Sequence, residues 1–261
     1  MNYLQRILIA LAFCLATGLA TLRPAWSQTG AVLPLAPEDQ QKITAKLGAG
    51  VVGQALPSQP ITDTSVYFPL QDRSPSYLVT AGKNAGNTQT LPLAKRNRPN
   101  GQPAWRAALS PTLAAFVRQT VEGDLMMASV ADSSHDVLVI TNPANPFLLK
   151  GMQPGETRTF NQSVSVNYLD DPTRRDYSGN MTGACTYVGT YQVSVPAGTY
   201  SAILMRVKVE GKVGPAHTTD TAYYFFAPQV GVVAMISQED VEAFWIIHID
   251  TSTGKVLASA S

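Results

Sequence analysis

The feature that most constrains this chain is an alternation of apolar and polar residues, which recurs with period two from about residue 64 onward. In TRTFNQSVSVNY, at 157–168, the residues Phe160, Val164 and Val166 fall on one face of an extended strand, and polar residues fall on the other. The stretch SAILMRVKVEG, at 201–211, repeats this pattern. Strands with one apolar and one polar face are typical of half-buried antiparallel sheets.

Further strands are expected wherever the same period, or a short apolar run, lies between turn residues. They cover 77–81, 114–121, 125–131, 136–141, 183–195, 221–226, 230–237 and 241–250. No helical period separates them, so the sequence predicts a mainly β fold. The expected forms are an antiparallel curved sheet, a half-barrel or a sandwich, with one short N-terminal helix.

That helix is expected in PEDQQKITAKLGAG, at 37–50. Pro37 and the two acids after it suit a first helical turn, and the glycines near the end suit its termination. Ile43 and Leu47 are four residues apart and share one helical face.

The first residues have the layout of a secretory signal peptide, because Arg6 precedes an apolar run from Ile7 and a small-residue pattern ends at Ser27. The apolar run is too short for a stable membrane span. Cleavage is expected after Ser27, so the mature chain is predicted to be periplasmic or secreted. Lipid attachment at Cys14 is the alternative, but lipoprotein processing requires Gly or Ala before the cysteine, and this chain has Phe13.

The predicted organisation is a signal peptide at 1–27, an entry segment with the short helix at 28–63, and a single antiparallel β domain at 64–261. No later stretch approaches the ~20 apolar residues of a transmembrane helix, so no transmembrane segment is expected in the mature chain.

The charge of the mature chain indicates no charge-driven partner. Loss of Arg6 and Arg23 with the signal peptide leaves 17 basic residues against 18 acidic ones, so the net charge changes from +1 to about −1. The basic run KRNR at 95–98 lacks interleaved aromatic residues, and it is predicted to be a solvated loop. No nucleic-acid partner is expected.

Three stretches are predicted to be connections between strands. In VPAGTY, at 195–200, Pro196 and Gly198 suit a hairpin turn better than a catalytic loop. VEGDL, at 121–125, is also predicted to be a hairpin turn. TNPANPFLLKGMQPGE, at 141–156, is expected to be a long irregular connection.

Cys185 is the single cysteine of the mature chain, so an intramolecular disulfide cannot form. Counting in twos along its strand places it on the apolar face with Met181, Tyr187 and Tyr191. A buried structural thiol is therefore preferred over a nucleophile.

The histidines give the candidate catalytic residues. His217 and Asp220 form the most site-like cluster, but a spacing of three sends their side chains to opposite faces of a strand. His248 and Asp250 share a face, and they could orient a proton transfer or mark the place where a strand meets solvent. His135 lies in DSSHD, which is predicted to be a polar turn.

Common catalytic and cofactor motifs are missing from the sequence: it has no G-x-S-x-G, no H-E-x-x-H, no C-x-x-C and no phosphate-binding glycine loop. Neither a metal site nor a cofactor is expected. The candidate ligand contacts are the consecutive aromatic residues Tyr223, Tyr224, Phe225 and Phe226, for which filling a core is the alternative role.

The stretch at 187–233 resembles uncharacterised secreted bacterial β proteins, in which a V-P-A-G-T-Y hairpin is followed by an aromatic strand and an A-P-x-x-G-x-V turn. This resemblance brings no catalytic residues. More loosely, the signal peptide, helix and antiparallel strands look like the half-barrel of periplasmic lipoprotein-localisation factors, which implies a curved sheet around an apolar cavity.

The resulting hypothesis is a non-catalytic periplasmic or secreted protein that binds a lipid, another apolar ligand or an envelope protein. An envelope hydrolase that uses His217 or His248 with a nearby carboxylate is one alternative. A purely structural interaction module is the other.

Overall fold

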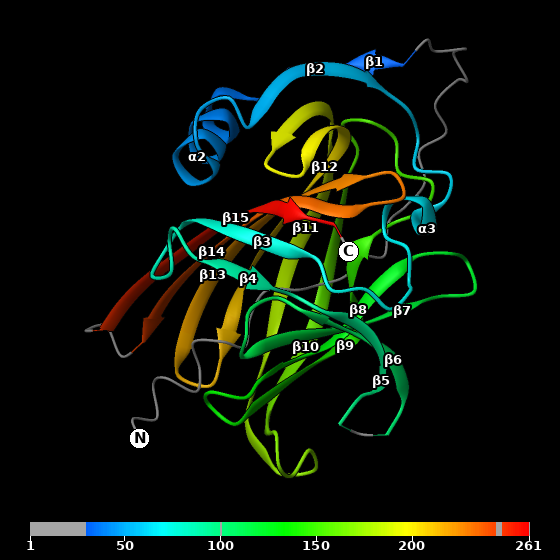
Figure 1. Ribbon diagram of the computed structural model, residues 1–261. Coiled ribbons are helices and arrows are strands. Elements are labelled where there is room, and N and C mark those ends of the chain that lie inside the picture. The colour runs from blue at the N-terminus through cyan, green and yellow to red at the C-terminus, as the bar shows by residue number, and fades with distance from the viewer. Residues whose placement is uncertain (1–29, 100, 244–246, 261) are drawn as a thin grey trace.

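The computed structural model describes residues 30–99, 101–243 and 247–260, and the side chains of residues 243–250 are outside this description. The predicted signal peptide and its cleavage site therefore lie outside the described residues. Most of the described chain forms a single antiparallel sheet that remains open, and two helices accompany it. This confirms the mainly β fold with an antiparallel curved sheet (Figure 1).

The helices are α2 (Pro37–Leu47) and α3 (Thr64–Tyr67). The strands are β1 (Ala31–Val32), β2 (Val52–Ser58), β3 (Ser76–Ala81), β4 (Thr88–Thr90), β5 (Leu93–Asn97), β6 (Pro103–Ala108), β7 (Leu113–Gln119), β8 (Leu125–Asp132), β9 (Val137–Leu148), β10 (Thr157–Tyr168), β11 (Arg175–Val195), β12 (Gly198–Val213), β13 (Ala216–Ala227), β14 (Gly231–Ala243) and β15 (Ile247–Ser259). The sheet order is β4-β3-β15-β14-β13-β12-β11-β10-β9-β8-β7-β6-β5, and β2 pairs with both β1 and β11.

The strand order makes the sheet curl. Its two edge strands, β4 and β5, are consecutive in the chain and are separated only by Leu91 and Pro92. A link of this length reaches about 10 Å, so the two ends of the sheet must approach each other. Leu93 of β5 also forms an isolated bridge with Arg73, which lies three residues before β3, and Figure 1 shows strands β5 to β9 turning away from β13 to β15.

Helix α2 forms as the sequence predicts. Pro37 stands at its start, Glu38 and Asp39 lie in its first turn, and Ile43 and Leu47 are buried. Acidic side chains at a helix N-terminus interact favourably with the helix dipole. The helix packs on β3, β14 and β15, so its apolar face closes one side of the sheet.

Asp39 anchors this helix to the sheet. Its carboxylate is 2% exposed. One oxygen accepts a hydrogen bond from the Tyr223 hydroxyl at 2.7 Å, and the other accepts from Arg206 Nη1 at 2.7 Å. Both donors lie on sheet strands, so this buried carboxylate fixes the position of the helix N-terminus.

The core has two large parts, one on each face of the sheet. The first includes residues from strands that are far apart in the sheet order, such as Leu93 of β5 and Val232 of β14, so the sheet curves around it. We call this face the inner face. The second part lies under α2 and β2 and includes Ile43, Tyr223 and Phe225. We call this opposite face the outer face.

An aromatic cluster fills the inner part of the core. The Phe147 ring contacts Phe68, Tyr224 and Phe226, with ring centroids 5.0 to 5.3 Å apart and planes 74 to 87° from parallel. Edge-to-face pairs of this kind are favourable beyond the area that they bury. Phe147 therefore joins β9 to β13 and to the segment after α3.

Several predicted boundaries are wrong. The expected irregular connection at 141–156 contains eight of the twelve residues of β9, and its residues Asn145, Pro146 and Leu148 pair with β8 despite the local turn signals. The predicted strands at 230–237 and 241–250 are divided differently, since β14 continues to Ala243 through the polar run SQED.

The basic run at 95–98 is not a loop, because most of it belongs to edge strand β5, where Lys95 and Arg96 are exposed. Charged side chains on an edge strand discourage pairing with another sheet. Helix α3 and strands β1 and β2 are also absent from the sequence-based prediction.

The predicted turns at 195–198 and 121–125 are confirmed. Val195 pairs with Gly198 across a two-residue loop, and Gln119 pairs with Leu125 across the other turn. Cys185 is fully buried on β11. Burial raises the pKa of its thiol to about 12, so it stays protonated and is a poor nucleophile at neutral pH.

Candidate functional site

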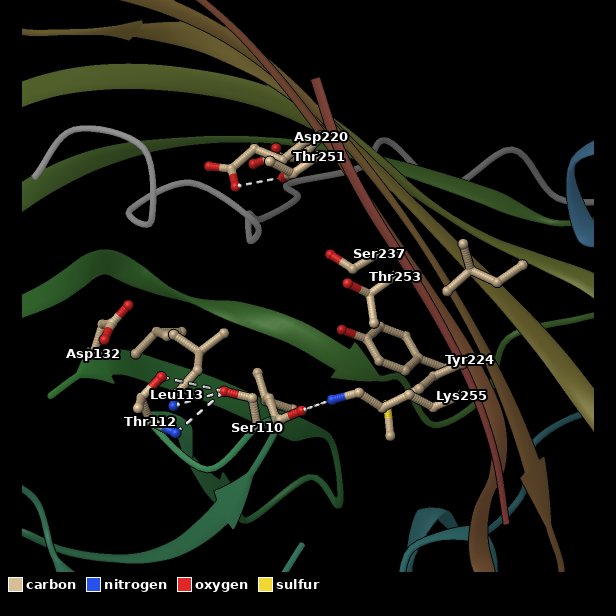
Figure 2. Close-up of a pocket in the computed structure, with 15 residues that line it drawn as sticks. Ser110, Thr112, Leu113, Asp132, Asp220, Tyr224, Ser237, Thr251, Thr253 and Lys255 are labelled. Atoms are coloured by element: carbon tan, nitrogen blue, oxygen red, sulfur yellow. Dashed lines mark hydrogen bonds between the residues drawn. The ribbon is translucent and has the colours of Figure 1, made fainter. Parts of the chain in front are cut away.

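A pocket of about 280 Å³ lies between the inner face of β13–β15 and the opposite wall, which is formed by the β6–β7 connection and β8. Its lining combines apolar, hydroxyl and charged side chains: Leu109, Ser110, Thr112, Leu113, Val130, Asp132, Asp220, Tyr224, Met235, Ile236, Ser237, Glu239, Thr251, Thr253 and Lys255. Figure 2 shows the two walls facing each other. The pocket thus exists because the sheet curls back on itself.

Strand register sets the order of side chains along the β13–β15 wall. Residues directly opposite each other on neighbouring strands project from the same face, so each row of partners forms a band across the wall. The rows are Tyr224–Met235–Lys255, Ala222–Ser237–Thr253 and Asp220–Glu239–Thr251. The wall therefore changes from largely apolar, through hydroxyl, to acidic.

Lys255 marks the more apolar end. Its side chain is buried, and Nζ donates to the carbonyl oxygen of Leu109 on the opposite wall (Figure 2). Burial lowers the pKa of Lys255 to about 8. This hydrogen bond ties the two walls together beside Tyr224 and Met235.

Asp220 and Glu239 mark the acidic end. Asp220 is 3% exposed, and neither of its carboxyl oxygens has a hydrogen-bond partner among the described residues. Glu239 is half-buried, and its one described hydrogen bond is a long 3.5 Å contact from the Thr251 hydroxyl. A buried carboxyl without partners destabilises a fold, so this end of the pocket requires a functional explanation.

The acidic pair holds protons more tightly than ordinary carboxyls. Burial raises the pKa of Glu239 to about 8. Burial also raises the pKa of Asp220, and the neighbouring charges of Glu239 and Asp240 add to the effect. Closely spaced carboxyls cannot both ionise without cost, so they titrate as a pair.

This pair should make stability fall as the pH rises. The folded state keeps protons that the unfolded chain loses above pH 4.5, so the free energy of unfolding decreases between about pH 4.5 and 8. The double variant D220N/E239Q should lack this decrease and should be more stable than the wild type at pH 8 by about 1–3 kcal/mol. Urea unfolding at pH 5, 6.5 and 8 measures the difference.

Lys255 does not disturb that comparison. Because its pKa is lowered to about 8, the folded state loses this proton before the unfolded chain does, so Lys255 makes the free energy of unfolding rise between about pH 8 and 10.5. Parallel pH profiles of the wild type and the double variant would contradict the assignment of buried, protonated carboxyls.

On the opposite wall, Asp132 already has partners. Its oxygens accept from Ser134 N and Oγ at 2.7 and 2.6 Å, and His135 Nδ1 lies 3.1 Å away. Ser134 Oγ and Asp132 both contact the same imidazole nitrogen, Nδ1. A catalytic triad needs the hydroxyl and the carboxylate on different nitrogens, so this cluster is a capped turn between β8 and β9.

The structure separates the first predicted catalytic pair. His217 is exposed on the outer face of β13, whereas Asp220 is buried on the inner face. His217 borders an open polar hollow with Asn161 and Asn180, and Asp220 does not line this hollow. Register places His248 opposite Glu242 and Asp250 opposite Asp240, but the side chains of His248 and Asp250 lie outside the described residues.

The four aromatic candidates point to both faces. Tyr223 and Phe225 pack in the outer core, and Tyr224 and Phe226 pack in the inner core. Tyr224 also lines the pocket, and its hydroxyl lies near Thr253 in Figure 2. One of the four consecutive aromatic residues thus belongs to the site, and the other three fill cores.

The sequence alone did not identify Glu239, Lys255, Thr251 or Thr253 as site residues. The local signal was a charged residue at an inward position of an alternating strand, as with Glu239 two residues before buried Val241. Recognising it required the β14–β15 register, which the sequence alone does not provide.

Within the described residues, no group of three or more His, Cys, Asp or Glu side chains is arranged to hold a metal ion. Neither α2 nor α3 is long and apolar enough to cross a membrane.

The sequence matches no protein-family model and has no significant match among curated proteins. Solved structures that resemble this chain include a protein of Parabacteroides distasonis inferred to be a lipoprotein. The two sequences are 12% identical, the match covers 78% of this chain and 100% of the other, and the TM-score is 0.33.

Another is a protein of Bacteroides fragilis inferred to be exported, with a YmcC-like fold. It is 13% identical, the match covers 75% of this chain and 99% of the other, and the TM-score is 0.36. A third is the hypothetical lipoprotein YmcC of Escherichia coli. It is 7% identical, the match covers 78% of this chain and 91% of the other, and the TM-score is 0.30. No residue role follows from likenesses this distant.

Proposed function

We propose that this chain is a non-catalytic binding protein of the bacterial envelope, or a secreted one, whose inner-face pocket takes a small amphipathic ligand. The observation that carries the proposal is the pocket itself, in which a buried carboxyl without described partners lies on the same wall as an apolar surface. The proposed location rests on the signal-peptide pattern of residues 1–27.

The composition of the pocket supports a ligand with two unlike ends. Small-molecule sites are mostly apolar hollows with a few polar groups that fix the orientation of the ligand. Here Leu113, Val130 and Tyr224 supply apolar surface, and Asp220 and Glu239 supply the polar groups. The volume of about 280 Å³ lies at the lower limit of such sites, which favours a short ligand over a long-chain lipid.

Filling the pocket should abolish binding. Thr253 is half-buried in the middle row of the β13–β15 wall, so T253W places an indole in the space that a ligand would occupy. We expect T253W to weaken binding of the apolar probe N-phenyl-1-naphthylamine by about tenfold or more. Fluorescence titration measures the affinity.

The matched control is T221W, because Thr221 is half-buried on the outer face of β13 and lies away from the pocket. If T253W does not unfold cooperatively, S237W from the same inner row replaces it. Equal affinity of the wild type and the filled variant, or no saturable binding by the wild type, would refute the proposed function.

A further inference from the structure

We infer that the ligand carries a protonated amine, which binds against Asp220 and Glu239 while its apolar part occupies the rest of the pocket. This inference rests on the proposed function and names the chemical class of the ligand. Two observations on the described residues support it: none of them gives the buried carboxyl of Asp220 a hydrogen-bond partner, and none places a cation beside it.

Among the described residues, Asp220 has none of the partners that normally stabilise a buried carboxylate. Both oxygens are buried and have no hydrogen-bond partner within the described part of the chain. Its row neighbours on the inner face are apolar Val209 on one side and Glu239 on the other. A second carboxyl makes ionisation harder, so the site is built to receive positive charge from outside the protein.

Lys255, the lysine that lines the pocket, is occupied elsewhere. Lys255 belongs to a row four residues from Thr251 on β15, about 13 Å along the strand, and it donates to the Leu109 carbonyl. His135 pairs with Asp132 on the opposite wall. Neither Asp220 nor Glu239 forms an ion pair with a lysine, arginine or histidine among the described residues.

Neighbouring hydroxyls complete an acceptor set for the N–H groups of an amine. Thr251 lies beside Glu239 in the acidic row, and Ser237 and Thr253 form the next row. An ammonium group has three donors and no acceptor, so two carboxylates and a hydroxyl oxygen would satisfy it.

The rest of the pocket favours an organic cation over a metal ion. A hard divalent cation prefers six or more oxygen ligands, including water, in a polar cage. Here the row next to the hydroxyl row carries the apolar surfaces of Tyr224 and Met235, and Leu113 adds apolar surface on the opposite wall. An alkyl or aromatic body would bury that surface, whereas a metal ion would leave it uncovered.

Binding should release protons. The raised pKa values favour protonated carboxyls when no ligand is bound, and an incoming ammonium favours the ionised carboxylates, whose protons pass to solvent. The other charged and titratable groups that line the pocket are Asp132 from β8, Tyr224 from β13 and Lys255 from β15, and the charge of Asp240 on β14 also acts on Asp220. Tyr224 stays neutral because burial raises its pKa.

The test compares three probes that share an eight-carbon chain: octylamine, octanol and octanoate. Each displaces N-phenyl-1-naphthylamine from the full mature protein at pH 7.5 and at pH 5, where octylamine remains protonated. We expect octylamine to bind about tenfold or more tightly than octanol at pH 7.5, because a hydrogen bond to a charged group is stronger than a neutral one. The advantage should shrink at pH 5, and octanoate should bind weakest.

Variants assign the selectivity to the acidic pair. D220N and E239Q keep the size of each side chain, and each should remove most of the preference for octylamine while octanol binding persists. The control is E242Q, because Glu242 is an exposed acid on the outer face of β14, the strand that carries Glu239. E242Q should behave as the wild type does.

The outcomes separate the two proposals. If octylamine and octanol displace the probe equally, and T253W blocks both, the pocket binds neutral ligands and the amine inference is wrong. If Ca²⁺ alone stabilises the protein and D220N removes that effect, the pair is an inorganic cation site, and the amine inference is again wrong. If the dye itself shows no saturable binding to the wild type, the proposed function fails.

Discussion

Replacing Asp39 by alanine is expected to lower the free energy of unfolding by about 3–5 kcal/mol, the usual effect of removing one member of a buried, hydrogen-bonded charge pair. The change leaves the Arg206 guanidinium and the fully buried Tyr223 hydroxyl without their acceptor. The Tyr223 hydroxyl would then stay buried without an acceptor, and the half-buried Arg206 would lose its nearest counter-charge. Urea unfolding monitored by circular dichroism measures the loss, and the melting temperature should fall by about 10 °C.

Glu38 provides the matched control, because it is the preceding residue in the same helical turn and differs in burial. Its carboxylate is 74% exposed and lies 4.0 Å from Arg206 Nη1. Exposed ion pairs contribute little, so E38A should change stability by less than about 1 kcal/mol. Similar losses for E38A and D39A would show that Asp39 acts only through the general charge of the helix N-terminus.

Replacing Phe147 by alanine should also cost about 3–5 kcal/mol. The substitution opens a cavity where Phe68, Tyr224 and Phe226 meet, and it removes three edge-to-face contacts. Chemical denaturation gives the change in unfolding free energy. F147L, which refills part of the volume, should recover part of the loss.

The control for this variant is V121A, since Val121 is fully exposed at the tip of the β7–β8 hairpin. Truncation there should change stability by less than about 0.5 kcal/mol. A loss below about 1.5 kcal/mol for F147A would mean that the surrounding rings collapse into the space, and that the cluster does not hold the two sides of the sheet in place.

The local features of this fold were predictable because they depend on neighbours in sequence. Period two identified β10 and β12, Pro37 and the following acids identified the start of α2, and Pro196 with Gly198 identified a hairpin. Each of these patterns reports a local geometry, either alternation across a strand or a dihedral preference. None of them depends on which strands become neighbours.

The pocket was not predictable for the opposite reason. Asp220, Glu239 and Thr251 form one band only because β13, β14 and β15 pair in a particular register. A shift of one residue would move Glu239 to the outer face. The sequence placed Asp220 in a candidate pair with His217, but the true neighbour lies on the next strand.

The segment at 141–156 shows how a strong local signal can mislead. Its prolines and asparagines indicate a loop, yet Phe147 and Leu148 are buried and extend β9. Burial of two large apolar side chains outweighed the local preference for a turn, which is the usual way that tertiary packing overrides propensity.

The pairing of β3 with β15 has a consequence for how the protein folds. β3, at Ser76–Ala81, pairs with β4 and with β15, the final strand, so one of its two neighbours lies more than 160 residues away. Contacts this distant in sequence are slow to form, because the entropy of a long closed loop must be lost before they can stabilise the chain. β3 and β4 cannot join β14 in the sheet before β15 is available, and β15 also lines the pocket, so formation of the pocket should be a late event in folding.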